Sequence, residues 1–224
     1  MRKTSSALLA KYRIDKENMG HVYGNSIKGF AVSLTDEQYQ SISPDPTVLA
    51  IEPDREIALA PPPGKCPRNG GGGGGSTAQK TPYGITRVGG GATYSGGKKA
   101  YIIDSEIDSY HPDLNVNVGA GYNAFTSGKD SNLANDGNVH GTHVSGTVGA
   151  KDNDIGVVGV AAGVIVVPVK ILNSRGSGSY SGVITGVDFV AANASEGDVA
   201  NMSLGEPVSA TLDAAVVWPL GTVE

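Results

Sequence analysis

A stretch of proline and glycine that cannot belong to a hydrophobic core divides the chain. Three prolines at positions 61–63 are followed by Cys66, Pro67 and six glycines at positions 70–75. Proline stiffens the backbone and consecutive glycines leave it flexible, so residues 61–77 are predicted to be a linker. A protease cuts an exposed linker readily. The 224 residues are therefore predicted to fold as two parts, residues 1–60 and residues 78–224.

The second part contains an apolar run that ends in a carboxylate. Residues 101–104 read Tyr-Ile-Ile-Asp, with no polar side chain interrupting the run before Asp104. A strand buried on both faces of a parallel sheet has this pattern. Catalytic groups of open α/β sheets gather beyond the carboxyl ends of such strands, which is where Asp104 is expected. The pattern predicts an α/β fold for this part of the chain.

A histidine-containing segment begins 36 residues after Asp104. Residues 140–148 read His-Gly-Thr-His-Val-Ser-Gly-Thr-Val, and residues 138–150 contain no proline, so a helix is predicted there despite two glycines. A carboxylate at a strand end and an imidazole at a helix start can meet across a crevice. The carboxylate then fixes the tautomer of the imidazole and stabilises its charged form. Asp104 and His140 are therefore candidates for two members of a hydrolytic triad.

Other interpretations of these residues stay open. An aspartate at a strand end is commonly a capping or turn residue. His140 and His143 could bind a metal together, and with Asp104 they would form a metal hydrolase. Zinc-binding helices more often space two histidines four residues apart with a glutamate between them, and no third ligand suggests itself. A catalytic metal is therefore not expected.

Five motifs in register resemble the subtilisin-like serine proteases (subtilases). The first comprises residues 104–105, 107–109 and 111–114, and the others occupy residues 140–143, 169–172, 176–180 and 201–205. The resemblance covers residues 79–215 and implies part of a subtilisin-like doubly wound parallel sheet. It also implies a serine endopeptidase in which Asp104 and His140 precede the serine in the chain, with His140 as the base and His143 in a structural role under the sheet.

The serine itself is not found. Neither the family's Gly-Thr-Ser-x-Ala-Pro segment with its oxyanion asparagine nor a Gly-x-Ser-x-Gly elbow occurs. We therefore expect a chain truncated before the catalytic serine, and expect these residues alone to be inactive.

The net charge of −5 gives no reason to expect nucleic-acid binding, and no run of 18 apolar residues suggests a membrane span. Localisation is expected to be secreted by family, although no signal peptide is present.

The first part has the pattern of a small α+β domain. Thr35 to Gln38 form a capping-box start for a helix that ends near Ile42, flanked by strand-like residues 29–34 and 48–52. Residues 7–57 resemble the subtilase propeptide, a ferredoxin-like domain that acts as inhibitor and folding chaperone. The resemblance implies a zymogen inhibited by its own propeptide, with cleavage near residues 77–78. An unrelated α+β module is the alternative.

The resemblance also implies two sets of binding residues. Peptide and protein substrates would pair with two strand edges and fill neighbouring subsites; this set is Leu172, Gly176, Ser177, Gly178, Tyr180, Ser203, Leu204 and Gly205. A structural calcium site would take side-chain and carbonyl oxygens; this set is Gln79, Asp113, Lys151, Asn153, Ile155 and Val157. A plain surface turn at residues 176–178, core packing of Leu172 and an acidic solvent loop are the alternatives.

Glu106 departs from the family's pattern, in which a glycine follows Asp-Ser. Glycine permits backbone conformations that glutamate resists, and an extra carboxylate could favour the protonated form of His140. Glu106 therefore favours an alternative function, a non-catalytic inhibitor-like or chaperone-like remnant that binds subtilases. Lys151, where the family has an apolar residue, would weaken cation binding through its ammonium.

Overall fold

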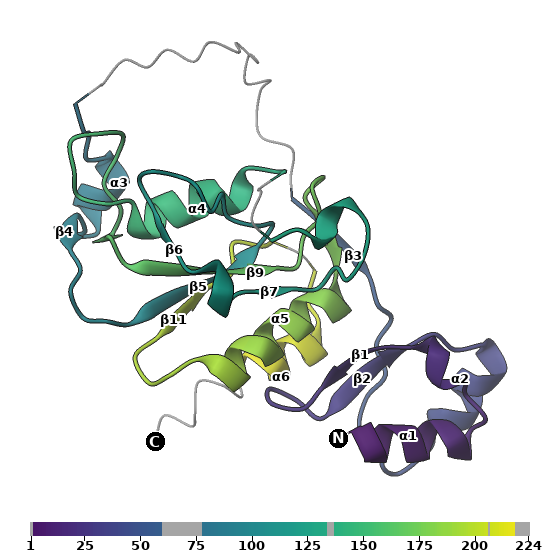
Figure 1. Cartoon of the computed structure of the whole chain (residues 1–224). Helices are drawn as coiled ribbons and strands as arrows, with labels where there is room; N and C mark the ends of the chain where they lie inside the picture. The colour runs from purple at the N-terminus through teal and green to yellow at the C-terminus, as the bar shows by residue number, and fades with distance from the viewer. Residues whose placement is uncertain (1, 60–77, 134–136, 206, 218–224) are drawn as a thin grey trace. The chain divides into compact units, whose positions relative to one another are not determined.

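The structure, a computed structural model, describes residues 2–59, 78–133, 137–205 and 207–217 (Figure 1). The linker predicted at residues 61–77, including Cys66, lies outside the described residues. The described residues form two compact units, and each unit is built from segments that are separated in the sequence. The described part of the first unit comprises residues 2–57, 178–194 and 207–217, and that of the second comprises residues 58–59, 78–133, 137–177 and 195–205.

A parallel sheet organises the second unit. Its strands are β5 (Lys99–Asp104), β6 (Asn115–Val116), β7 (Tyr122–Asn123), β9 (Ile165–Lys170) and β11 (Val199–Asn201). Their order is β11-β5-β9-β6, β7 also pairs with β9, and every pairing is parallel. The last residues of β5 and β9, Asp104 and Lys170, are register partners. The prediction of an α/β fold with a parallel sheet is confirmed.

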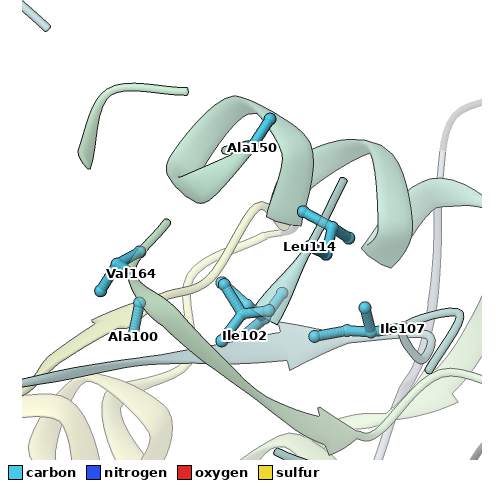
Figure 2. Packing of buried hydrophobic residues seen from close by; sticks show 7 residues of the cluster. Ala100, Ile102, Ile107, Leu114, Ala150 and Val164 are labelled. Carbon is cyan, nitrogen blue, oxygen red and sulfur yellow. The ribbon is translucent and has the colours of Figure 1, made fainter. Parts of the chain in front are cut away.

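Strand β5 is buried along almost its whole length. Residues 100–104 are all buried, and only Lys99 is partly exposed. Ala100 and Ile102 join Ile107, Leu114 and other apolar side chains in a core cluster beside helix α4 (His140–Gly149), as Figure 2 shows. The remaining elements of this unit are α3 (Tyr83–Arg87), β4 (Ala92–Thr93), β8 (Ala161–Ala162) and the short 3-10 turns Val118–Ala120 and Lys129–Ser131. The burial confirms the prediction made from residues 101–104.

The first unit combines helices with short strands. It contains α1 (Arg2–Lys11), a 3-10 turn (Lys16–Asn18), β1 (Met19–Tyr23), β2 (Gly29–Val32), α2 (Asp36–Ile42), α5 (Tyr180–Asn193) and α6 (Ala210–Val217). It also contains β3 (Glu56–Ala58) and β10 (Ser177–Ser179) except for Ala58 and Ser177, which belong to the second unit. Strands β1 and β2 form an antiparallel hairpin, and β3 pairs with β10. The Thr35–Gln38 capping box forms as predicted, and Ile42 at the end of α2 packs with Leu9 and Ile14.

The strand predicted at residues 48–52 does not form. The Asp45 carboxylate accepts the backbone N–H of Thr47 at 2.8 Å, and the N–H of Val48 bonds the Asp45 carbonyl, so the segment begins in a turn. Val48 and Ile51 instead pack against the Leu9 cluster as irregular chain. The apolar side chains of this segment are therefore packed against the core although the segment pairs with no strand. Helix α1 was not anticipated from the sequence. No described helix is long and apolar enough to cross a membrane.

Candidate active site

Asp104 and His140 meet as the sequence predicts. The Nδ1 atom of His140 lies 2.8 Å from Oδ1 and 2.9 Å from Oδ2 of Asp104. The carboxylate is 1% exposed, whereas the His140 side chain is 32% exposed. Asp104 also accepts the N–H of Ser105 at 2.7 Å, which fixes the orientation of its carboxylate. A buried acceptor on Nδ1 holds the imidazole with Nε2 available for proton transfer.

The start of α4 is docked closely on the loop that follows β5. The N–H of Gly141 donates to Oγ of Ser105 at 3.1 Å, and Oγ1 of Thr142 accepts the N–H of Asp108 at 2.9 Å. A Cβ at position 141 would lie 2.1 Å from the carbonyl oxygen of Glu106, so only glycine permits this approach. These contacts explain how a strand end and a helix start bring two side chains together.

Glu106 does not disturb the pair in the way that the sequence suggested. Its backbone is not among the non-glycine residues with positive φ in the described chain, which are Arg13 and Val139. Its side chain is buried and forms an ion pair with Lys170, and its Oε1 accepts the N–H of Gly137 at 2.6 Å. The expectation of a strained backbone is therefore wrong. The carboxylate is balanced by the ammonium of Lys170, so it is not an uncompensated negative charge beside His140.

His143 does not lie under the sheet. Gly141 and Ser145 are the buried residues at the start of α4, and they lie one turn apart on the same face. His143 stands between them in sequence and therefore points away from that face, where it is exposed. Among the described residues, no three or more His, Cys, Asp or Glu side chains gather in a way that could hold a metal ion.

The second unit holds most of the predicted substrate-binding residues. Leu172 is fully buried, and its N–H donates to the carbonyl of Asp104 at 3.1 Å. Gly176 has a φ of +78°, and its carbonyl accepts the N–H of Leu59 at 2.9 Å, so the edge at this position already pairs with another segment of the chain. Ser177 begins β10. Ser203, Leu204 and Gly205 follow β11 without regular structure, and Oγ of Ser203 donates to Asn201.

Two of these residues belong to the first unit. Gly178 lies in β10, and Tyr180 opens helix α5. The Tyr180 side chain is 5% exposed, and its hydroxyl donates to the Pro207 carbonyl. The N–H of Tyr180 donates to the carbonyl of Arg55 at 3.0 Å, so residues before the linker pair with this segment.

Five of the six predicted calcium ligands are joined by hydrogen bonds, and Val157 lies outside this group. The Gln79 amide donates to the Lys151 carbonyl at 2.8 Å, and the Asn153 amide donates to Asp113 at 2.7 Å. Asn153 also accepts the N–H of Ile155, and Val157 is bridged to Lys80. A Cβ at Gly156, whose φ is +63°, would lie 2.9 Å from the Asp113 carboxylate. The ammonium of Lys151 bonds the Pro112 carbonyl. Asp113, the two amides and the backbone carbonyls are oxygen donors of the types that calcium takes.

The sequence interpretation missed an acidic side chain in the first unit that fixes the β1–β2 turn. The buried carboxylate of Asp188 on α5 accepts the N–H groups of Gly24, Asn25 and Ser26 at 3.0, 2.6 and 2.7 Å. Burial alone would raise the pKa of Asp188, but these hydrogen bonds outweigh it and the pKa is lowered. The sequence signal that could have revealed this role is a single aspartate among the apolar residues of the segment that forms α5.

Two more carboxylates cap helices of the same unit. Asp54 accepts the N–H of Ser181 at 3.0 Å and its hydroxyl at 2.6 Å, in the first turn of α5. Glu52 accepts the N–H of Thr211 at 3.1 Å and the hydroxyl of Ser209 at 2.7 Å, at the start of α6. The Ser209 bond is the main cause of the lowered pKa of Glu52. Negative charge at helix N-termini is stabilising, so residues 52–54 hold both helices.

Comparison with known proteins agrees with this arrangement. Residues 97–221 match the sequence model of the Subtilase family, and residues 2–60 match that of Peptidase inhibitor I9. The fold and site thus define a subtilisin-like α/β domain preceded by an inhibitor-type propeptide domain. The chain belongs to the subtilase family.

Alignments with individual relatives cover most of this chain but only about half of each relative. Subtilisin E of Bacillus subtilis (strain 168) is 38% identical over 196 residues, which are 85% of this chain and 45% of the relative. Subtilisin of Bacillus pumilus is 45% identical over 145 residues, 62% of this chain and 50% of the relative. A solved structure of a cold-adapted subtilisin-like serine proteinase is 42% identical with a TM-score of 0.49, covering 58% and 45% of the two chains. The chain spans about half the length of the curated relatives it matches.

Proposed function

We propose that this chain is part of a subtilisin-type serine endopeptidase that is made as a zymogen. The observation that carries the proposal is the buried Asp104 carboxylate bonded to Nδ1 of the partly exposed His140. In the proposed reaction, a serine outside these 224 residues attacks the peptide carbonyl. His140 accepts its proton through Nε2 and returns it to the leaving amine, while Asp104 orients the ring and stabilises its charged form.

Self-inhibition by the propeptide is supported by contacts within each unit. In the first unit, Asp54 caps α5 and the β1–β2 turn is held by Asp188. In the second, Leu59 donates its N–H to the carbonyl of Gly176. A segment that adds to an exposed strand edge by backbone pairing imitates an extended peptide. The residues before the linker would therefore occupy the edge that a substrate needs.

The same strand edge supports the proposal that the substrates are proteins and peptides. Backbone pairing at residues 176–178 and 203–205 would give affinity without regard to substrate sequence, and side-chain subsites would add selectivity. Leu172 and Tyr180 are the proposed subsite residues. Because Leu172 is fully buried, it would act as the floor of a subsite, reached only when neighbouring side chains shift. We further propose that the protein is secreted, as the family implies.

Calcium is proposed as a structural ligand held by Asp113, Gln79 and Asn153, with carbonyls of Lys151, Ile155 and Val157. When bound it would supply positive charge that ties the segment at Gln79 to the loop after α4. Rotation of the Gln79 and Asn153 side-chain amides by about 180° would point their oxygens, rather than their NH₂ groups, at the cation. We expect calcium to raise the melting temperature and EGTA to lower it. Asp113→Asn should remove this dependence and Asp154→Asn, on the exposed part of the same loop, should keep it.

The test of the proposed function begins with the transcript beyond the codon for Glu224. An in-frame serine segment of the family's kind is expected there, and the whole protein should then be expressed with and without His140→Ala. We expect hydrolysis of casein by the whole protein, a loss of about 10⁴-fold or more in kcat for the variant, and no hydrolysis by the 224 residues alone. Turnover by the 224 residues, or turnover that survives His140→Ala, would refute the proposal.

Glu106 does not favour an inhibitor-like remnant in the folded chain, because its carboxylate is paired with the ammonium of Lys170.

A further inference from the structure

A buried ammonium lies at the end of β9, next to the candidate site. Lys170 has no exposed surface, and its Nζ donates to the carbonyl of Leu172 at 2.8 Å. It forms an ion pair with Glu106 and lies 4.0 Å from Oδ1 of Asp130 and 5.3 Å from the centre of the Phe125 ring. Burying a lysine is costly unless a carboxylate compensates its charge, so Lys170 and Glu106 depend on each other.

The second oxygen of Glu106 reaches the segment that leads into α4. Oε1 accepts the N–H of Gly137 at 2.6 Å, three residues before His140. Between them, Val139 has φ +77° and ψ −14°, a left-handed conformation that a β-branched residue avoids. Such a conformation persists only where surrounding contacts enforce it. The Gly137 bond lies two residues before Val139, and His140 follows Val139 directly.

We infer that Glu106 is a positioning residue for His140. Its carboxylate, held by Lys170, anchors Gly137, fixes the left-handed turn at Val139 and so sets the direction from which the His140 ring meets Asp104. The inference rests on the proposed function for its catalytic meaning. The positioning itself is a property of the folded chain, whether or not the chain takes part in catalysis.

The test compares two double variants of the 224-residue chain. Glu106→Gln with Lys170→Met removes both buried charges and keeps an oxygen acceptor for Gly137. Glu106→Met with Lys170→Met removes the same charges and the acceptor as well. A control, Lys99→Met with Asp198→Ala, removes the ion pair at the opposite end of β5, where the two side chains lie 3.7 Å apart. Circular dichroism establishes that each variant is folded.

The readout is the tautomer of the neutral His140 ring, measured by long-range ¹H–¹⁵N NMR and assigned by loss of its signals in His140→Gln. Asp104 holds the proton on Nδ1, whereas a free neutral imidazole favours Nε2. We expect the Nδ1–H form in the unchanged chain, in the control and in the Gln variant, and its loss in the Met variant. A Met variant that folds and keeps the Nδ1–H form of His140 overturns the inference.

Amide exchange at Gly137 in the unchanged chain provides a second measurement, which decides the matter if the Met variant does not fold. The N–H of Gly137 should exchange at least about tenfold more slowly than an unbonded amide, as expected for a hydrogen bond to a charged acceptor. Exchange at the unbonded rate would overturn the inference. Neither readout requires turnover, so absence of protease activity in the whole protein would refute the proposed function and leave this inference standing.

Discussion

Replacing Asp188 by Asn tests how the β1–β2 turn is held. In the first unit the Oδ1 atom of Asp188 accepts four donors, from Gly24, Asn25 and both the N–H and the hydroxyl of Ser26. Oδ2 accepts the Asn25 side-chain amide at 3.0 Å and shares the Gly24 N–H at 3.2 Å. The side chain is 7% exposed, so water cannot replace these bonds without local opening.

The expected cost follows from this donor set. In Asp188→Asn the oxygen can stay at the Oδ1 position, but the new NH₂ group then faces two donors, so the Asn25 amide bond and the longer Gly24 contact are lost. The other four bonds change from charged to neutral acceptors, which are roughly half as strong. Together we expect a loss of about 2–4 kcal/mol in the free energy of opening the turn.

The pH dependence has a definite sign. The pKa of Asp188 is lowered in the folded chain, because the hydrogen bonds to its charged form outweigh burial. A carboxyl with a depressed folded pKa contributes stability that is fully present above its unfolded pKa of about 4, and that is lost as the pH falls through the folded value. The difference between the unchanged chain and Asp188→Asn should thus be constant from pH 7 to about 5 and shrink below about 4.

Native-state amide exchange of Gly24, Asn25 and Ser26 is the assay, because it reports this turn without requiring two-state unfolding of the whole chain. A cost of about 2–4 kcal/mol corresponds to exchange faster by about 30-fold to several hundredfold. Asp213→Asn, an exposed carboxylate on α6 of the same unit, is the matched control and should change nothing. Equal exchange in Asp188→Asn and the control at pH 7 would show that the carboxylate does not hold the turn.

Two further predictions concern helices. Gly141→Ala would place a Cβ 2.1 Å from the Glu106 carbonyl and should destabilise by about 1–3 kcal/mol, whereas Gly146→Ala meets nothing within 4 Å and should stabilise α4 by about 0.5–1 kcal/mol. Opposite shifts in melting temperature are expected, and shifts of the same sign would contradict the packing argument. Thr35→Ala removes the capping box of α2 and should cost about 1 kcal/mol in urea unfolding, while Ser33→Ala, exposed and outside the helix, should be neutral.

The parts of the fold that the sequence predicts are those with a local physical cause. The apolar residues of β5 and the capping box of α2 depend on side-chain periodicity and on a short-range hydrogen bond, and both appear as expected. Residues 48–52 have the composition of a strand, but strand formation also needs a partner edge, which composition does not encode. Helix α1 was missed because its polar residues at positions 2–6 give no clear apolar stripe.

The candidate site divides in the same way. Asp104 and His140 could be predicted because each sits at the end of an element whose position the pattern determines. His143 could not be placed by resemblance alone, since its burial depends on which face of α4 Gly141 and Ser145 occupy. The role of each substrate-binding and calcium residue stays a prediction, although five of the six calcium residues are joined by hydrogen bonds.

Glu106 shows why a side chain cannot be interpreted from its sequence neighbours alone. Beside Asp104 in the sequence, its charge suggested interference with His140. The register of β5 and β9 pairs Asp104 with Lys170, so the chain turn after β5 brings Glu106 to that ammonium. The residue that compensates the charge lies 64 positions later, and only the parallel pairing of the two strands reveals it. A charge that departs from a family's pattern should therefore be judged together with its register partners before it is taken as evidence against activity.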